Sequence, residues 1–178
     1  MHLTPRQIES RMFELIDSPQ NTLKLRDEAA FGMPVVGYAS GADPLFDVRT
    51  YENGMPGLDP RAWLEAKYGQ SYAPAHISVI SWALPIPEPV REKMRIEHYY
   101  PCLEWSLNMT YGTEFIRYMA RELEHFFEQL GIDAVAPMAD ERIRRMRAEK
   151  YGAGTNWSET MAAYVAGLGT PRYPFGLI

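Results

Sequence analysis

Apolar side chains recur every three or four residues in several stretches of the chain, which predicts helices with one apolar face. The strongest such pattern runs from Thr113, the expected cap, to Leu130, and Gly131 ends it. A proline directly behind a capping residue marks two other helix starts. Five helices are predicted. One begins after Thr4 and one after Asp59, and the other three cover residues 113–130, 140–150 and 158–166.

Short apolar runs that are rich in β-branched residues and bounded by turn formers predict strands. The expected strands are residues 34–39, 76–82, 132–136 and 175–178. The run 132–136 directly follows the long predicted helix, as the next strand of an α/β unit would. Strands that alternate with helices predict an α/β or α+β fold in which helices cover a mixed sheet.

Composition and charge narrow the class of protein. The chain has 178 residues, of which 46% are hydrophobic and 23% charged, as in an ordinary globular protein. Because it has neither a run of about 20 apolar residues nor a secretory signal, we expect a cytoplasmic protein without a membrane span. A net charge of -5 argues against broad electrostatic binding of nucleic acid.

No low-complexity linker divides the chain, so one compact domain is expected. Residues 1–74 are interpreted as an N-terminal helix and a Pro/Gly-rich arm packed on a core of residues 75–178. The basic stretch 142–150 is interpreted as a solvated helix face, with contact to a phosphate or an RNA backbone as the alternative.

Metal-binding side chains are scarce. Cys102 is the only cysteine, which excludes an internal disulfide and any iron–sulfur cluster held by this chain alone. The four histidines form no metal-binding pair at helical spacing. The composition therefore indicates no metal site within the chain.

The segment Gly167-Leu168-Gly169 leaves two interpretations open. It is not a dinucleotide-binding fingerprint, because Arg172 occupies the third glycine position and a helix, not a strand, precedes it. The first interpretation is a helix C-cap at Gly167 with a tight turn at Gly169. The second is a close approach of the backbone to a large planar ligand.

A succession of motifs fills the second half of the chain. They are ISVISWALP at 77–85, YG at 111–112, QLG at 129–131, AVAP at 134–137 and NWSETMAAYVAGLGT at 156–170. This succession resembles the corrinoid-binding domain shared by epoxyqueuosine reductases and respiratory reductive dehalogenases, an iron–sulfur protein family. The resemblance covers roughly residues 75–178.

The resemblance implies a nitroreductase-like α/β sandwich that binds cobalamin in its base-off form and reduces a substrate with electrons from iron–sulfur clusters. The residues it places at the site are Tyr111 and Asn156 as catalytic residues, and Ser158, Gly167, Leu168 and Gly169 as cofactor contacts.

The chain departs from the family pattern in three places. With one cysteine it holds no cluster, and it ends at Ile178, where the family's cysteine-rich segment would begin. The position of the acid found in epoxyqueuosine reductases falls at Ala153. Pro171 and Pro174 remove amide donors from the segment behind the glycine turn. Reductase activity is therefore expected only if another protein, such as an iron–sulfur electron donor, supplies the electrons.

Two other functions stay open. The chain could be a non-catalytic interaction subunit or a truncated remnant, whose apolar C-terminal strand pairs with a second chain, including a second copy in a homo-oligomer. The weaker alternative is a flavin-dependent reductase, since nitroreductase-like folds commonly hold flavin.

Overall fold

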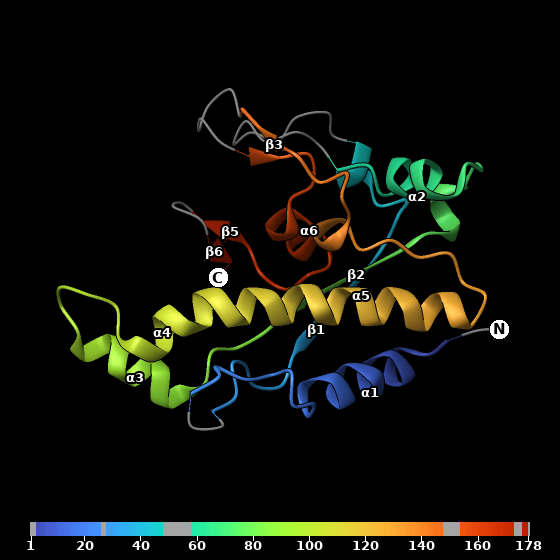
Figure 1. Ribbon diagram of the computed structural model, residues 1–178. Helices are drawn as coiled ribbons and strands as arrows, with labels where there is room; N and C mark the ends of the chain where they lie inside the picture. Colours follow the sequence, from blue (N-terminus) through green and yellow to red (C-terminus); the bar gives the residue numbers. More distant parts are fainter. Residues whose placement is uncertain (1–2, 26–27, 48–57, 148–153, 173–175, 178) are drawn as a thin grey trace. The chain divides into compact units, whose positions relative to one another are not determined.

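The chain forms a mixed α+β structure (Figure 1). The structure, a computed structural model, describes residues 3–25, 28–47, 58–147, 154–172 and 176–177. The fold divides into two compact units: Met1–Pro34 with Leu84–Phe126, and Val35–Ala83 with Phe127–Ile178. Each unit is thus assembled from segments that are far apart in the sequence.

The first unit is helical. Its elements are α1 (Pro5–Ile16), α3 (Glu88–Ile96), α4 (Leu103–Leu107), the π-helix η3 (Asn108–Gly112) and most of α5 (Thr113–Gln129). The helix predicted behind Thr4 is confirmed, and its capping box pairs Thr4 with Gln7. The apolar stripes of α1 and α5 are buried, with Met12, Phe115 and Met119 almost fully enclosed.

The predicted cap at Thr113 is wrong, although the helix behind it is correct. The segments α4, η3 and α5 follow one another without a break, and Thr113 has helical dihedral angles, φ -63° and ψ -38°. Its hydroxyl donates to the Met109 carbonyl oxygen at 2.7 Å instead of capping a helix start. A threonine inside a helix satisfies its hydroxyl in this way through the preceding turn.

The second unit contains an antiparallel pair of strands, β1 (Val35–Ser40) and β2 (Ser78–Ala83), in which Val36 faces Trp82. Its helices are α2 (Pro60–Tyr68) and α6 (Glu159–Val165), with short 3-10 turns η1 (Pro44–Asp47), η2 (Pro74–His76) and η4 (Pro137–Ala139). Two shorter antiparallel pairs join β3 (Arg145–Met146) to β4 (Gly154–Thr155) and β5 (Pro171–Arg172) to β6 (Gly176–Leu177). The strands of the described residues form separate antiparallel pairs, not one mixed sheet.

Both elements predicted between residues 132 and 147 are wrong. Residues 132–136 form no strand, because the side chains of Lys67 and Tyr68 bind the backbone groups of Ala134 that a neighbouring strand would use. Residues 140–147 form no helix, because the Asn156 side chain binds the Arg144 N–H and the Arg142 carbonyl oxygen, and Arg145–Met146 pair with β4. These partners occupy backbone groups that a helix would use for its own hydrogen bonds. Residues 148–150 of this prediction lie outside the described residues.

The other predictions for this unit are confirmed. The helix behind Asp59 ends at Gly69, which has a left-handed φ of 67°. The strands predicted at 34–39 and 76–82 are β1 and β2, with their bounds shifted by one or two residues. Of the predicted strand 175–178, the described part is β6. No helix of the described residues has the length and apolar character to cross a membrane.

Candidate functional site

Helix α6 and the turn behind it carry four of the six site residues that the sequence predicts. The Ser158 hydroxyl caps the helix start by accepting the Met161 amide proton at 3.3 Å. At the other end Gly167 has a φ of 78°, and its N–H donates to the Tyr164 carbonyl oxygen at 3.0 Å. The C-cap interpretation of Gly167 is therefore confirmed.

The glycine turn has one packed side and one open side. A Cβ atom at Gly37 of β1 would clash with the Ala166 carbonyl oxygen and lie 2.9 Å from Leu168 Cγ. The turn is therefore pressed against the backbone of β1, and Leu168 belongs to that contact. Among the described residues, no atom lies within 4 Å of a Cβ atom placed at Gly167, so none of them covers the turn there.

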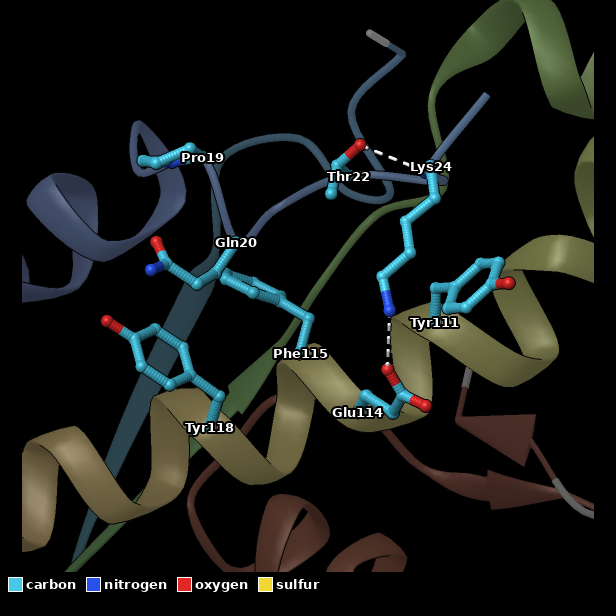
Figure 2. Close-up of a pocket in the computed structure, with 8 residues that line it drawn as sticks. All are labelled: Pro19, Gln20, Thr22, Lys24, Tyr111, Glu114, Phe115 and Tyr118. Carbon is cyan, nitrogen blue, oxygen red and sulfur yellow. Dashed lines mark hydrogen bonds and ion pairs between the residues drawn. The ribbon is translucent and has the colours of Figure 1, made fainter. Parts of the chain in front are cut away.

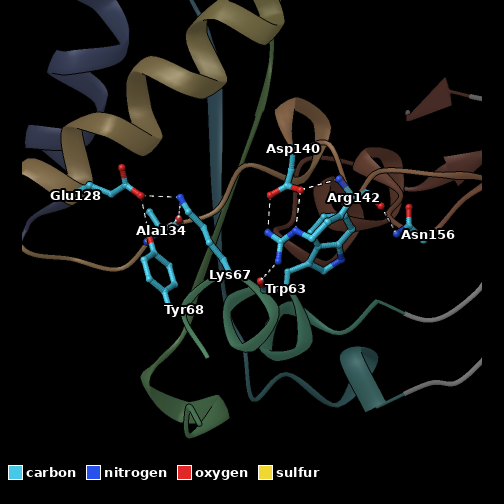
Figure 3. Close-up of polar contacts among 8 residues, drawn as sticks. All are labelled: Trp63, Lys67, Tyr68, Glu128, Ala134, Asp140, Arg142 and Asn156. Atoms are coloured by element: carbon cyan, nitrogen blue, oxygen red, sulfur yellow. Dashed lines mark hydrogen bonds and ion pairs between the residues drawn. The ribbon is translucent and has the colours of Figure 1, made fainter. Parts of the chain in front are cut away.

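The Asn156 side chain binds the backbone of the loop 142–144, which precedes it by more than ten residues in the sequence (Figure 3). Its amide oxygen accepts the Arg144 N–H at 2.7 Å, and its amide nitrogen donates to the Arg142 carbonyl oxygen at 3.0 Å. Its backbone N–H also donates to the Arg144 carbonyl oxygen at 3.1 Å. These contacts make Asn156 a positioning residue for the loop 142–144.

Replacing Asn156 with alanine is expected to lower the free energy of unfolding by about 1–2 kcal/mol, because its two side-chain hydrogen bonds to the backbone of Arg142 and Arg144 are lost. Denaturant titration measures the change. The neighbouring variant Thr160→Ala, at an exposed position of α6, serves as the control. Equal stabilities of the Asn156 and Thr160 variants would contradict the positioning role.

Trp157 lies at the start of α6 with its ring in the core. It is 6% exposed and packs edge-on against Trp63, with ring centroids 6.1 Å apart. Its indole nitrogen is buried and has no hydrogen-bond partner in the part of the chain that the structure describes. The surrounding protein raises the pKa of the Glu159 carboxyl group, even though that residue keeps an exposed surface.

Arg142 is committed to contacts inside the unit. Its guanidinium group donates to both carboxylate oxygens of Asp140, and its carbon lies 5.4 Å from the centre of the Trp63 ring. The guanidinium group holds the pKa of Asp140 below its usual range. Figure 3 shows Arg142 between Asp140 and Trp63. The first arginine of the basic stretch is thus paired, not free to bind a phosphate.

A second polar group joins α2 to the segment behind α5 (Figure 3). The Tyr68 hydroxyl lies 2.8 Å from the Ala134 carbonyl oxygen and from a carboxylate oxygen of Glu128, which also pairs with Lys67 Nζ at 2.6 Å. Burial is the main cause that raises the pKa of Tyr68. Sequence patterns could not find this group, because its members lie about 60 residues apart and share no motif.

Tyr111, the other predicted catalytic residue, belongs to the first unit, where it lies in the π-helix η3. Lys24 Nζ lies 4.2 Å above the centre of its ring. Asn156, Ser158 and the glycine turn belong to the second unit. No group of three or more metal-binding side chains occurs among the described residues.

Comparisons with known proteins give no relative. The chain matches no protein-family model, and no curated protein or solved structure is significantly similar to it.

Proposed function

We propose that the second unit is the cofactor-binding part of a corrinoid-dependent reductive enzyme, with a nitroreductase-like sandwich as its wider fold. In this proposal the chain holds the cofactor, and a separate iron–sulfur protein supplies the electrons. The observation that carries the proposal is that three of the five motifs behind the resemblance share one core.

Three of those motifs meet in the buried cluster of the second unit. Val79 comes from the motif 77–85, Val135 packs against the cluster from the motif 134–137, and Trp157, Met161 and Ala162 come from the motif 156–170. In the sequence, 48 residues separate the first two motifs. This common core supports the proposal because it brings the three motifs together in one folded unit, as a single cofactor-binding domain requires.

The glycine turn offers a surface that suits a large planar cofactor. Such a ligand needs exposed backbone without side chains in front of it, and none of the described residues covers the turn at Gly167. In the proposal the backbone of Gly167 and Gly169 contacts the cofactor, while Leu168 fixes the turn against β1. When bound, a corrinoid supplies a redox-active cobalt. Ser158 and Asn156 shape the site through their internal hydrogen bonds.

The proposal is tested by titrating the purified chain with cob(II)alamin. Binding is expected to convert the absorption spectrum to the base-off form, and calorimetry should record heat. An unchanged spectrum without heat would overturn the proposal. Yellow protein with a flavin spectrum would point instead to the flavin-dependent alternative.

A matched pair of variants locates the site. Gly167 and Gly69 both follow a helix with a left-handed φ, and a Cβ atom at either would meet nothing within 4 Å. Asparagine tolerates this backbone conformation, so Gly167→Asn and Gly69→Asn should retain the fold. Only Gly167→Asn places a side chain in front of the turn, and it is expected to weaken cobalamin binding at least about tenfold, or about 1.4 kcal/mol. Equal affinities would place the cofactor elsewhere.

A further inference from the structure

The first unit contains a pocket of about 350 Å³ that the proposed function does not use (Figure 2). One wall is the loop behind α1, and the other is the helical segment from η3 into α5. The lining residues are Pro19, Gln20, Thr22, Lys24, Tyr111, Glu114, Phe115 and Tyr118. The volume falls in the range of small-molecule sites, which start at about 300 Å³.

An ion pair stands beside the aromatic part of this pocket. Lys24 Nζ lies 3.2 Å from a carboxylate oxygen of Glu114 and 4.2 Å from the centre of the Tyr111 ring. Figure 2 shows the Lys24 side chain reaching down to both residues. The two charged side chains are 55% and 60% exposed, so water screens the pair and a ligand can compete for either charge at small cost.

The backbone sets the direction of Lys24. It is the one non-glycine residue with a positive φ among the described residues, at 55°, and its N–H donates to the Thr22 hydroxyl at 3.0 Å. Left-handed backbone at a residue other than glycine is uncommon and persists where the surroundings fix it. The Lys24 side chain leaves this loop toward the helix, where its ammonium group lies beside Tyr111 and Glu114 and stays partly exposed to solvent.

We propose that this pocket binds a free aromatic α-amino acid. A zwitterion carries an ammonium and a carboxylate group on one carbon atom, so it can pair its carboxylate with Lys24 and its ammonium with Glu114. Tyr118 is partly exposed and offers an aromatic surface for the ligand's ring, and the buried Phe115 ring supports it from below, with ring centroids 6.2 Å apart. A ligand with one charge would satisfy only one member of the pair and leave the other without its partner.

Calorimetric titration with L-phenylalanine tests the proposal on the intact chain. Two analogues separate a free amino acid from the ends of a peptide: phenylalanine amide lacks the carboxylate, and N-acetylphenylalanine lacks the ammonium. L-phenylalanine is expected to bind at least about tenfold more tightly than either analogue. Equal affinities for all three, or no binding of L-phenylalanine at millimolar concentration, would overturn the proposal.

Variants connect the binding to the ion pair. Lys24→Gln and Glu114→Gln are each expected to weaken binding of L-phenylalanine about tenfold. Lys93→Gln is the matched control, because Lys93 is also exposed in the first unit and pairs with a glutamate, Glu104. Binding that survives Lys24→Gln, or that Lys93→Gln weakens equally, would show that the Lys24–Glu114 pair does not recognise the ligand. None of these outcomes depends on cobalamin binding by the second unit.

Discussion

Replacing Asn21 with alanine is expected to lower the free energy of unfolding by about 3–5 kcal/mol, because three buried backbone groups would lose their partners at once. The Asn21 amide nitrogen donates to the carbonyl oxygens of Ile16 and Phe31 at 3.0 and 2.8 Å. Its amide oxygen accepts the Phe31 N–H at 2.9 Å. Asn21 is 7% exposed, so water cannot replace these bonds. One side chain thus ties the end of α1 to the segment that leads toward β1.

Denaturant titration at neutral pH measures this effect, with Gln20→Ala as the control at an exposed neighbouring position. Asn21→Asp sharpens the test, because it keeps the acceptor for Phe31 but turns a carboxylate oxygen toward two carbonyl oxygens. It is therefore expected to be at least as destabilising as the alanine variant. A loss below about 1 kcal/mol for either variant would contradict the assigned bonds.

Helices whose ends carry a capping residue, a proline or a glycine were predicted correctly from the sequence. Thr4 before Pro5 and Asp59 before Pro60 mark the starts of α1 and α2, and Gly69 and Gly167 end α2 and α6. Each of these signals acts on the hydrogen bonds of a single helix turn, so it needs no knowledge of the rest of the fold. The paired strands β1 and β2 were found because their apolar runs are bounded by turn formers.

Errors arose where distant side chains satisfy the backbone. The segment 132–136 has the composition of a strand, but Lys67 and Tyr68 bind Ala134 from α2. The helix α3 was not predicted, although Pro87 and Pro89 lie at its start, where an amide proton is not needed. Such arrangements depend on which segments meet in space, and no local pattern records this.

The local part of the candidate site was also predictable from the sequence, whereas its contacts with distant segments were not. The helix α6 with its cap and glycine turn follows from residues 156–170 alone, so Ser158 and Gly167 were identified from sequence. The partners of Asn156 were not, since Arg142 and Arg144 lie in a segment expected to be helical. The pocket in the first unit joins Lys24 to Glu114 across 90 residues, and neither position stands out in the sequence.

Replacing Gly37 with alanine is expected to lower the free energy of unfolding by about 2–3 kcal/mol, because the new methyl group has no room. It would clash with the Ala166 carbonyl oxygen and lie 2.9 Å from Leu168 Cγ. A carbonyl group of the main chain cannot turn aside as a flexible side chain can, so β1 and the glycine turn must move apart. In the proposed function this movement also displaces the turn that contacts the cofactor.

The sign of the change makes this test decisive. Gly37 has no positive φ, so alanine in an uncrowded strand would reduce the flexibility of the unfolded chain and stabilise the protein by about 0.5–1 kcal/mol. Denaturant titration of Gly37→Ala therefore separates the two cases by direction, with Val35→Ala as the control at a 59% exposed position of the same strand. Stabilisation by Gly37→Ala would contradict the tight contact between β1 and the turn. Destabilisation of that variant alone, with Val35→Ala close to neutral, is the result that this packing requires.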